Sequence, residues 1–175
     1  MASRKAALVT GAATGIGAAA VLALARAGFD VALNYSSSEA AARETAAAAE
    51  KLGARTLLVR CDVSDEQAVR AMLQSVEQAF HRLDALINNA GTTASWKPKD
   101  LESLSLEEWD RVFAVNVRGL FQVTRASLPL LRKGENPSIV NTASIVGLRP
   151  GPQPLPYAAA KAAVVNLARS VALDV

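Results

Sequence analysis

Tyr157 and Lys161 lie four residues apart in a stretch with a helical pattern, so we expect both side chains on one face of a helix. A free phenol, with a pKa of about 10, is a poor acid at neutral pH. A neighbouring ammonium favours the phenolate, and a tyrosine in that setting can give its proton to a carbonyl oxygen as hydride reaches the carbon. Taken alone, such a pair is more often a packed ring beside a lysine that extends to solvent. Its interpretation therefore depends on the residues around it.

Two further polar residues are expected near this pair. Ser144 follows a strand-like run and precedes Tyr157 by thirteen residues, so its hydroxyl can hold a substrate oxygen beside the phenol. Asn116 opens a predicted helix and can bond a water that connects Lys161 to solvent. A serine that follows a strand is more often a cap or a turn residue, so Ser144 also has a plain structural interpretation.

The chain begins with an apolar run that ends in a glycine-rich turn, Thr10-Gly11-Ala12-Ala13-Thr14-Gly15-Ile16-Gly17. Such a turn between a first strand and a first helix directs backbone N–H groups and the positive end of the helix dipole at a pyrophosphate. Gly11 would allow the tight turn, Gly15 a close approach to the phosphates, and Gly17 close packing of the helix on the sheet. A plain glycine turn is the alternative. The cofactor contacts expected from this turn are Gly11, Thr14, Gly15, Ile16 and Gly17.

The ends of later strands add candidates for the same site. Asp62 follows the third strand, where a carboxylate can accept from an adenine amino group; it can equally be a turn residue before Ser64, which we expect to cap the next helix. Asn88-Asn89-Ala90-Gly91 ends the fourth strand, where asparagines can tie neighbouring strands and a glycine lets the backbone approach a ligand. The cofactor contacts expected from these ends are Asp62, Val63, Asn89, Ala90 and Gly91.

The end of the second strand bears on the choice between NADP and NAD. An NAD enzyme usually places a carboxylate there to bind the ribose, whereas this chain has Asn34-Tyr35-Ser36-Ser37-Ser38, and Asp30 lies at the opposite end of the strand. Hydroxyl groups without a carboxylate favour a 2′-phosphate, so the sequence predicts NADP in preference to NAD, with Asn34, Tyr35 and Ser36 at the cofactor. The absence of an arginine at Thr14 or in the 34–38 stretch weakens that preference.

Strand and helix patterns alternate, which predicts an α/β fold: a three-layer, Rossmann-like, doubly wound parallel sheet with right-handed crossovers. The predicted strands are Ala6–Thr10, Val31–Tyr35, Arg55–Arg60, Ala85–Asn88 and Ser138–Thr142. The predicted helices are Ile16–Ala27, Glu39–Leu52, Asp65–Phe80, Leu106–Phe113, Asn116–Arg132 and Tyr157–Val175. Two loops, Thr92–Asp100 and Arg149–Pro156, follow the carboxyl ends of strands, where open α/β sheets bind ligands.

Composition narrows the class of protein. The 175 residues include one cysteine and one histidine and carry a net charge of +3 without a block of consecutive basic residues, so we expect no nucleic-acid partner and no metal site. A single cysteine fits a cytoplasmic protein without a disulfide. Glycines interrupt the uncharged run from Ala6 to Ala25, which argues against a signal peptide or membrane span. We expect one dinucleotide-binding domain over residues 1–175.

Together these motifs resemble the short-chain dehydrogenase/reductase family in its single-domain form. The residues that carry the resemblance are Thr10-Gly11-x-x-x-Gly15-x-Gly17, Asp62, Asn88-Asn89-Ala90-Gly91, Asn116, Ser144 and Tyr157-x-x-x-Lys161. The resemblance implies a catalytic tetrad of Asn116, Ser144, Tyr157 and Lys161, with Tyr157 and Lys161 also at the cofactor. Within the family the chain looks like NADP-dependent 3-oxoacyl-carrier-protein reductases. Sugar and secondary-alcohol dehydrogenases look similar, so the small carbonyl or alcohol substrate stays open.

The chain departs from the family pattern at Val175, inside the helix that carries Tyr157 and Lys161. Family members continue with a sixth strand, a substrate lid and a seventh strand. Two expectations follow. One is an oxidoreductase seen as the N-terminal portion of a longer enzyme. The other is an incomplete form without turnover that binds dinucleotide weakly or not at all, or associates with other subunits. The fifth strand would present an apolar edge. Because similar proteins associate through the helices 116–132 and 157–175, a homodimer or homotetramer is expected.

Overall fold

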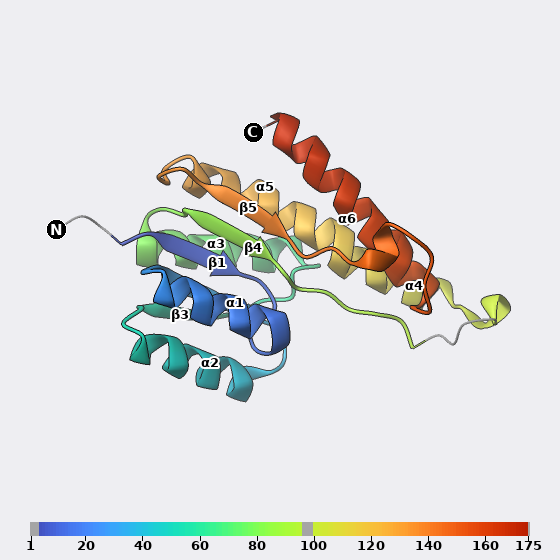
Figure 1. The fold of residues 1–175 in the computed structure, drawn as a ribbon, viewed down its shortest axis with the longest axis horizontal. Helices are drawn as coiled ribbons and strands as arrows, with labels where there is room; N and C mark the ends of the chain where they lie inside the picture. Colours follow the sequence, from blue (N-terminus) through green and yellow to red (C-terminus); the bar gives the residue numbers. More distant parts are fainter. Residues whose placement is uncertain (1–3, 96–99, 175) are drawn as a thin grey trace.

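The computed structural model describes residues 4–95 and 100–174, and its centre is one parallel sheet in the order β3-β2-β1-β4-β5 (Figure 1). The strands are β1 (Ala6–Val9), β2 (Asp30–Tyr35), β3 (Thr56–Arg60), β4 (Ala85–Asn88) and β5 (Ser138–Asn141). The helices are α1 (Gly15–Arg26), α2 (Glu39–Lys51), α3 (Glu66–Phe80), α4 (Leu106–Phe113), α5 (Leu120–Leu131) and α6 (Leu155–Asp174). The predicted doubly wound α/β sheet is confirmed. Residues 96–99 of the predicted loop Thr92–Asp100, and Val175 of the last predicted helix, lie outside the described residues.

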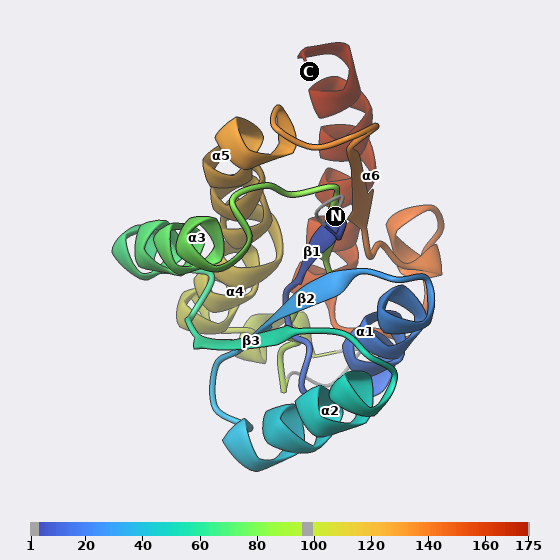
Figure 2. The ribbon, with the colours of Figure 1, turned by 90° about the vertical axis from the view of Figure 1, so that its left-hand side faces the viewer.

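Helices cover both faces of this sheet, which gives three layers (Figure 2). On one face α1 and α2 pack on β1 and β2, and the cluster includes Val21, Ala46 and Leu33. On the other face α3 and α5 pack on β1 and β4, through side chains such as Met72 and Val123. Both clusters are mainly aliphatic, as expected for a parallel sheet that is buried on both sides.

Two buried aspartates hold the amino ends of the strands together. Asp84 Oδ2 accepts from the backbone N–H of Ala6 at 2.9 Å, and its Oδ1 accepts from the N–H of Glu135 at 2.7 Å. Arg82 pairs with the same carboxylate. Asp30 accepts from Arg55 Nε at 2.7 Å and lies at this edge, as the sequence indicated. These hydrogen bonds lie at the amino ends of the strands, so the carboxyl ends remain available for a ligand.

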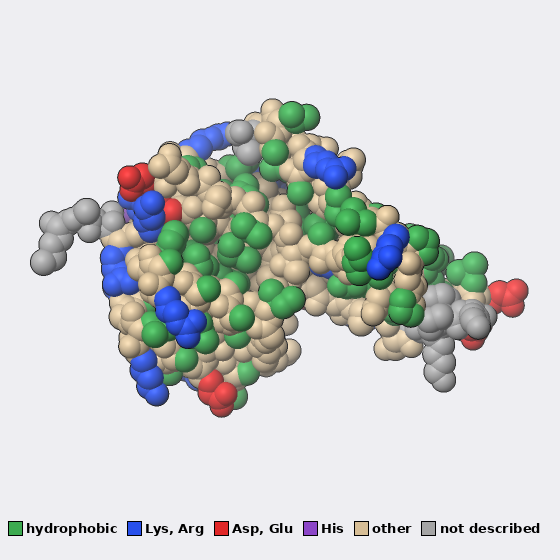
Figure 3. Space-filling model, in the orientation of Figure 1, with side chains coloured by type: hydrophobic (Ala, Val, Ile, Leu, Met, Phe, Trp, Pro, Cys, Tyr) green, Lys and Arg blue, Asp and Glu red, His purple; other side chains and the backbone are tan. Residues whose placement is uncertain are grey.

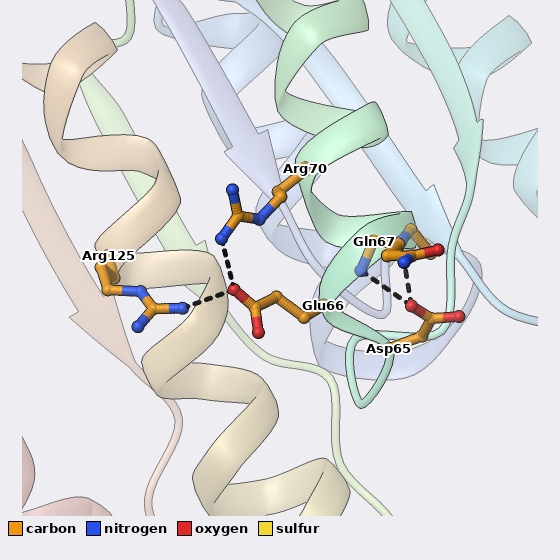
Figure 4. A network of polar contacts seen from close by, with 6 residues as sticks. Asp65, Glu66, Gln67, Arg70 and Arg125 are labelled. Atoms are coloured by element: carbon orange, nitrogen blue, oxygen red, sulfur yellow. Dashed lines mark hydrogen bonds and ion pairs between the residues drawn. The ribbon is translucent and has the colours of Figure 1, made fainter.

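Ion pairs link the helices α3 and α5 (Figure 4). Glu66 Oε1 accepts from Arg70 Nη2 at 2.7 Å and from Arg125 Nη2 at 2.9 Å. Asp65 caps α3 by accepting from two backbone N–H groups of its first turn. The prediction that Ser64 is this cap was wrong, because the Ser64 hydroxyl donates to Asp62 Oδ1 at 2.8 Å instead.

The strand β5 has one neighbour within residues 4–95 and 100–174, which is β4. Val140 on this strand is 51% exposed. A cavity of about 780 Å³ lies between β5 and the last turns of α6, and apolar side chains such as Ile139 and Val171 line it. The sheet therefore has the open apolar edge that the sequence predicted. In the same described residues, no helix is both long enough and apolar enough to cross a bilayer.

The Asp84 carboxylate generates a prediction about stability. Burial opposes its ionisation, but hydrogen bonds from Arg82 and from the backbone of Glu135 and Ala6 outweigh that effect and hold the pKa of Asp84 below its ordinary value. Asp84→Asn should therefore lower the free energy of unfolding at pH 7 by about 3 kcal/mol, measured by urea denaturation.

The pH dependence of this difference has a definite sign. A carboxylate whose folded pKa is depressed stabilises the protein above its unfolded pKa of about 3.9, and this contribution is lost as the pH falls through the folded value. The exposed Glu44→Gln on α2 serves as the control, with an expected change below about 0.5 kcal/mol. Equal effects of the two substitutions would contradict the assignment.

Candidate active site

The site begins where the turn after β1 meets the turn after β4, at the point where the strand order reverses. Asn89 Nδ2 donates to the backbone oxygens of Thr10, at 3.1 Å, and Gly11, at 3.0 Å. Thr10 Oγ1 accepts from the N–H groups of Asn89 and Ala90, both at 3.0 Å. The prediction that an asparagine ties neighbouring strands is confirmed. Crevices at such reversal points are the usual ligand sites of open α/β sheets.

Two glycines make this close approach possible. A Cβ added at Gly17 would lie 2.2 Å from Gly11 O and 2.6 Å from Asn89 Nδ2, and one added at Gly11 would lie 2.9 Å from Ala90 Cα. Gly15 differs, since nothing lies within 4 Å of an added Cβ, while its φ of +58° is a left-handed value. Gly17 thus serves packing, Gly11 serves both packing and the tight turn, since its φ is +61°, and Gly15 keeps one surface of the turn open.

The N-terminus of α1 faces this opening, and no side chain of the helix accepts a hydrogen bond from its first backbone N–H groups. The Thr14 side chain makes no capping hydrogen bond, and the first turn holds no acidic residue. The first N–H groups of a helix lack intrahelical acceptors and attract anions. Ile16 is 69% exposed beside them. This turn therefore has the donors and the uncovered apolar side chain that a dinucleotide would engage.

A cavity of about 370 Å³ lies next to the turn. In the space-filling view, the outline of the molecule is indented between the side that holds α1 and α2 and the end that holds α4 (Figure 3). Asn34 accepts from the Gly11 N–H at 3.3 Å and donates to Cys61 O at 2.9 Å, so it fixes the shape of the cavity wall. The predicted cofactor residues that line the cavity are Gly11, Asn34, Ser36, Asp62, Val63, Ala90 and Gly91.

Two of the predicted residues at this cavity need comment. Asp62 Oδ1 accepts from the Ser64 N–H at 2.9 Å, which is the turn arrangement that the sequence left open. Tyr35 is buried at the end of β2 and does not line the cavity. The expected contact between Tyr35 and the cofactor therefore has no support from the cavity wall.

A second cavity of about 560 Å³ adjoins the first and shares Gly91 and Thr92 with it. Ser144 and Tyr157 both line this second cavity. The Ser144 hydroxyl accepts from the Val146 N–H at 3.4 Å, a long contact that leaves its proton available for donation. The structure therefore brings the predicted serine and tyrosine to one wall, next to the glycine that separates the two cavities.

Lys161 lies behind this wall and is almost completely buried, with an exposed fraction of 4%. Its Nζ donates to Thr142 O at 2.6 Å and lies 5.6 Å from the centre of the Tyr157 ring. Burial lowers the pKa of the Lys161 ammonium from its ordinary value. The predicted juxtaposition of the phenol and the ammonium on one helix is present.

Asn116 occupies an unexpected position in its helix. It lies in a π-helical turn (Ala114–Gly119) that joins α4 to α5, so the prediction that Asn116 begins a helix was wrong. Its Nδ2 donates to Thr92 O and Val112 O, both at 2.8 Å, while the buried Oδ1 has no partner within the described part of the chain. A Cβ added at Gly91 would lie 2.7 Å from this Oδ1 and 3.8 Å from Lys161 Nζ. π-helical turns of this kind are frequent at functional sites.

The sequence indicated the loops 92–100 and 149–156 but not which of their residues line the cavities, and it did not indicate Arg111. Arg111 lines the smaller cavity and donates to Thr92 Oγ1 and to Thr93 O, each at 2.8 Å. Thr93 and Gln153 line the larger cavity. The position of the two threonines directly after Gly91 was an available signal. Arg111 gave none, because its contacts depend on how α4 crosses the loop.

Metal ligands are the last candidates to consider. Across residues 4–95 and 100–174, no group of three His, Cys, Asp or Glu side chains is arranged to hold a metal ion. Cys61 is a free, buried thiol, and burial raises its pKa to about 11. Such a thiol is inert at neutral pH.

The contrast between Gly17 and Gly15 generates a prediction. Gly17→Ala should lower the free energy of unfolding by at least about 2 kcal/mol, because its methyl group meets backbone atoms that cannot move independently. Gly15→Ala should cost about 1 kcal/mol, from the left-handed backbone alone. Chemical denaturation followed by circular dichroism measures both. A Gly17→Ala protein as stable as Gly15→Ala would show that the two turns are not packed as described.

Comparison with known proteins agrees with this geometry. The family model of the short chain dehydrogenases matches residues 5–175. The 3-oxoacyl-[acyl-carrier-protein] reductase FabG of Staphylococcus aureus is 35% identical over 170 residues, which cover 97% of this chain and 68% of that protein.

Two solved structures are similar throughout the chain. A short chain dehydrogenase from Burkholderia cenocepacia, in complex with NADP, has a TM-score of 0.90 and 38% identity, covering 97% of this chain and 68% of that one. A 3-oxoacyl-[acyl-carrier protein] reductase from Brucella melitensis, in complex with NAD, has a TM-score of 0.90 and 29% identity, covering 99% and 69%. On the family match, the sequence similarity and the shared fold, this chain belongs to the short-chain dehydrogenase/reductase family of oxidoreductases.

Proposed function

We propose that the chain interconverts a ketone and a secondary alcohol by hydride transfer with a nicotinamide dinucleotide, with NADP preferred over NAD. The observation that supports this most directly is the placement of Tyr157. Its ring lies 5.6 Å from the Lys161 ammonium and lines the same cavity as Ser144, beside Gly91. Residues 1–175 would act as one dinucleotide-binding domain.

The chemistry of the crevice supports the proposal of a bound dinucleotide. The uncapped N-terminus of α1 offers N–H donors to a pyrophosphate, with Gly15 leaving room for it. The cavity lined by Asn34, Ser36 and Asp62 suits an adenosine group. A bound nicotinamide dinucleotide supplies or accepts the hydride. Val63, Ala90 and Gly91 complete the wall of the adenosine cavity, and Asn89 holds the turn after β1 beside it.

Residues of this chain donate the proton and allow its return from solvent. The Tyr157 hydroxyl donates its proton to the carbonyl oxygen during reduction, and the Ser144 hydroxyl holds the same oxygen by a second hydrogen bond. The buried Lys161 ammonium favours the phenolate that remains, because its positive charge lies near the ring. The unpartnered Oδ1 of Asn116 can accept from a water that returns the proton from solvent.

The substrate class we propose is 3-oxoacyl compounds. The similarity to FabG supports this choice, and the cavity of about 560 Å³ combines the apolar Ile145 and Val146 with the polar Thr93 and Gln153. A 3-ketoester such as ethyl acetoacetate has the matching chemistry, a ketone beside an ester carbonyl. It is therefore the first probe.

Substitution of the acid generates a prediction. NADPH oxidation with 3-ketoesters, followed at 340 nm, should fall by about 10²- to 10⁴-fold in Tyr157→Phe, because the phenylalanine ring has no hydroxyl proton to give to the carbonyl oxygen. The affinity for NADPH, measured by fluorescence titration, should change by less than about twofold. Ser144→Ala should also lose activity, whereas Ser75→Ala on the outer face of α3 should not. Unchanged turnover in Tyr157→Phe would show that the acid is elsewhere.

A second candidate function has a specific observation in its favour. The open edge of β5 and the cavity beside it suggest a form that binds dinucleotide, or associates with other subunits, without turnover of its own. The same assay separates the two, since this form would bind NADPH and leave every 3-ketoester unreduced.

Self-association through the helices is part of the proposal. Phe113, Val117, Phe121 and Leu167 line a cavity of about 890 Å³ on the outer side of α4, α5 and α6. Phe121 is 42% exposed there. A second copy would cover this apolar surface, and symmetric dimers are the commonest assemblies of identical chains.

Size-exclusion chromatography with light scattering tests the association. The unsubstituted chain should be a dimer or tetramer, and Phe121→Glu should shift it to monomer because a charged side chain would replace the aromatic ring that the second copy covers. Leu52→Glu is the matched control, since Leu52 is 40% exposed at the end of α2 in the opposite layer. A monomeric parent chain would contradict the proposal.

A further inference from the structure

The segment between β2 and α2 carries the groups closest to the ribose end of the proposed adenosine cavity. Ser36 lines that cavity, and Ser36, Ser37 and Ser38 are all exposed. Their hydroxyls can donate to an anion, but they cannot supply a positive charge. This segment therefore contains no cation that could bind the phosphate of a phosphorylated ribose.

The cation comes from the neighbouring strand. Arg60 is the last residue of β3 and pairs in register with Tyr35, the last residue of β2. Its side chain crosses to the next segment, where Nε donates to Ser36 O at 3.1 Å. This hydrogen bond anchors the guanidinium beside a residue of the cavity wall.

Arg60 differs from the other arginines near it. Arg55 pairs with Asp30, and Arg43 pairs with Glu39. Arg60 is exposed and forms no ion pair with any carboxylate of residues 4–95 and 100–174, so its two Nη groups remain available. A guanidinium with free Nη groups is well suited to bind a phosphate by two parallel hydrogen bonds.

The two carboxylates nearest to Arg60 in the chain and on the adjoining helix are engaged by other groups. Glu39, the first residue of α2, accepts from Arg43 Nε at 2.9 Å and from Nη2 at 2.6 Å, so its charge is balanced. Asp62 directs Oδ1 to the Ser64 N–H and hydroxyl. The N-terminus of α2 adds a favourable dipole, since Ser38 makes no side-chain cap.

We propose that Arg60 selects NADP over NAD by binding the 2′-phosphate of the adenosine ribose, assisted by the hydroxyl of Ser36. This rests on the proposed function and identifies the residue that would decide its cofactor. A phosphate monoester gains a charge-assisted contact with Arg60, while the 2′-hydroxyl of NAD does not.

Two nucleotides test this without any turnover. Isothermal titration calorimetry should show that 2′,5′-ADP binds at least about tenfold more tightly than 5′-AMP, which lacks the 2′-phosphate. Arg60→Met should weaken 2′,5′-ADP at least about tenfold and change 5′-AMP by less than about twofold. Arg60→Lys should recover part of the affinity, since the charge remains without the planar fork. Arg60→Glu should favour NAD over NADP.

The control and the contrary outcomes are distinct. Arg26→Met removes the same charge at the opposite end of α1 and should leave both affinities unchanged. An unaltered ratio of 2′,5′-ADP to 5′-AMP affinity in Arg60→Met would overturn the role of Arg60 and leave the proposed function standing. Failure of the unsubstituted chain to bind either nucleotide, or NADPH, would overturn both. Equal melting temperatures of the variants establish that they are folded.

Discussion

The close approach of the turns after β1 and β4 is the constraint on which the rest of the site depends. Thr10 and Asn89 hold these turns together with four hydrogen bonds, and Gly17 supplies the clearance that those bonds need. Because the strand order reverses between β1 and β4, the helices that follow these strands lie on opposite faces of the sheet. A crevice opens between them, with the N-terminus of α1 on one side and Gly91 on the other.

The catalytic candidates are assembled behind that crevice from elements far apart in the chain. Gly91 follows β4, Asn116 lies in the π-helical turn, and Lys161 lies on α6, yet their atoms converge around a single backbone position. The amino ends of the strands are meanwhile tied by Asp30 and Asp84. The amino ends of the strands are therefore held rigidly, and the carboxyl ends are open for binding and chemistry.

The sequence predicted the features that depend on local spacing. The alternation of elements, the roles of Gly11 and Gly17, and the pairing of Tyr157 with Lys161 all follow from residue type and period. The sequence did not predict features that depend on which of two adjacent residues caps a helix, or on contacts between neighbouring strands. Ser64 and Asp65 are both good caps, and the carboxylate of Asp65 takes the position. Asn116 lies in a π-helical turn inside a continuous helix, and the residue pattern does not distinguish such a turn from the start of a helix. The contact of Arg60 with Ser36 depends on the register of β2 and β3, which the sequence does not give.

The most direct test of the central claim is an NMR titration of the ¹⁵N-labelled chain of 175 residues with NADPH. We expect saturable shifts of the backbone amides of Gly15, Ile16, Gly17 and Gly91, which surround the crevice, with small changes at the amino ends of the strands. An unchanged spectrum at millimolar NADPH, or shifts confined to the open edge of β5, would contradict it.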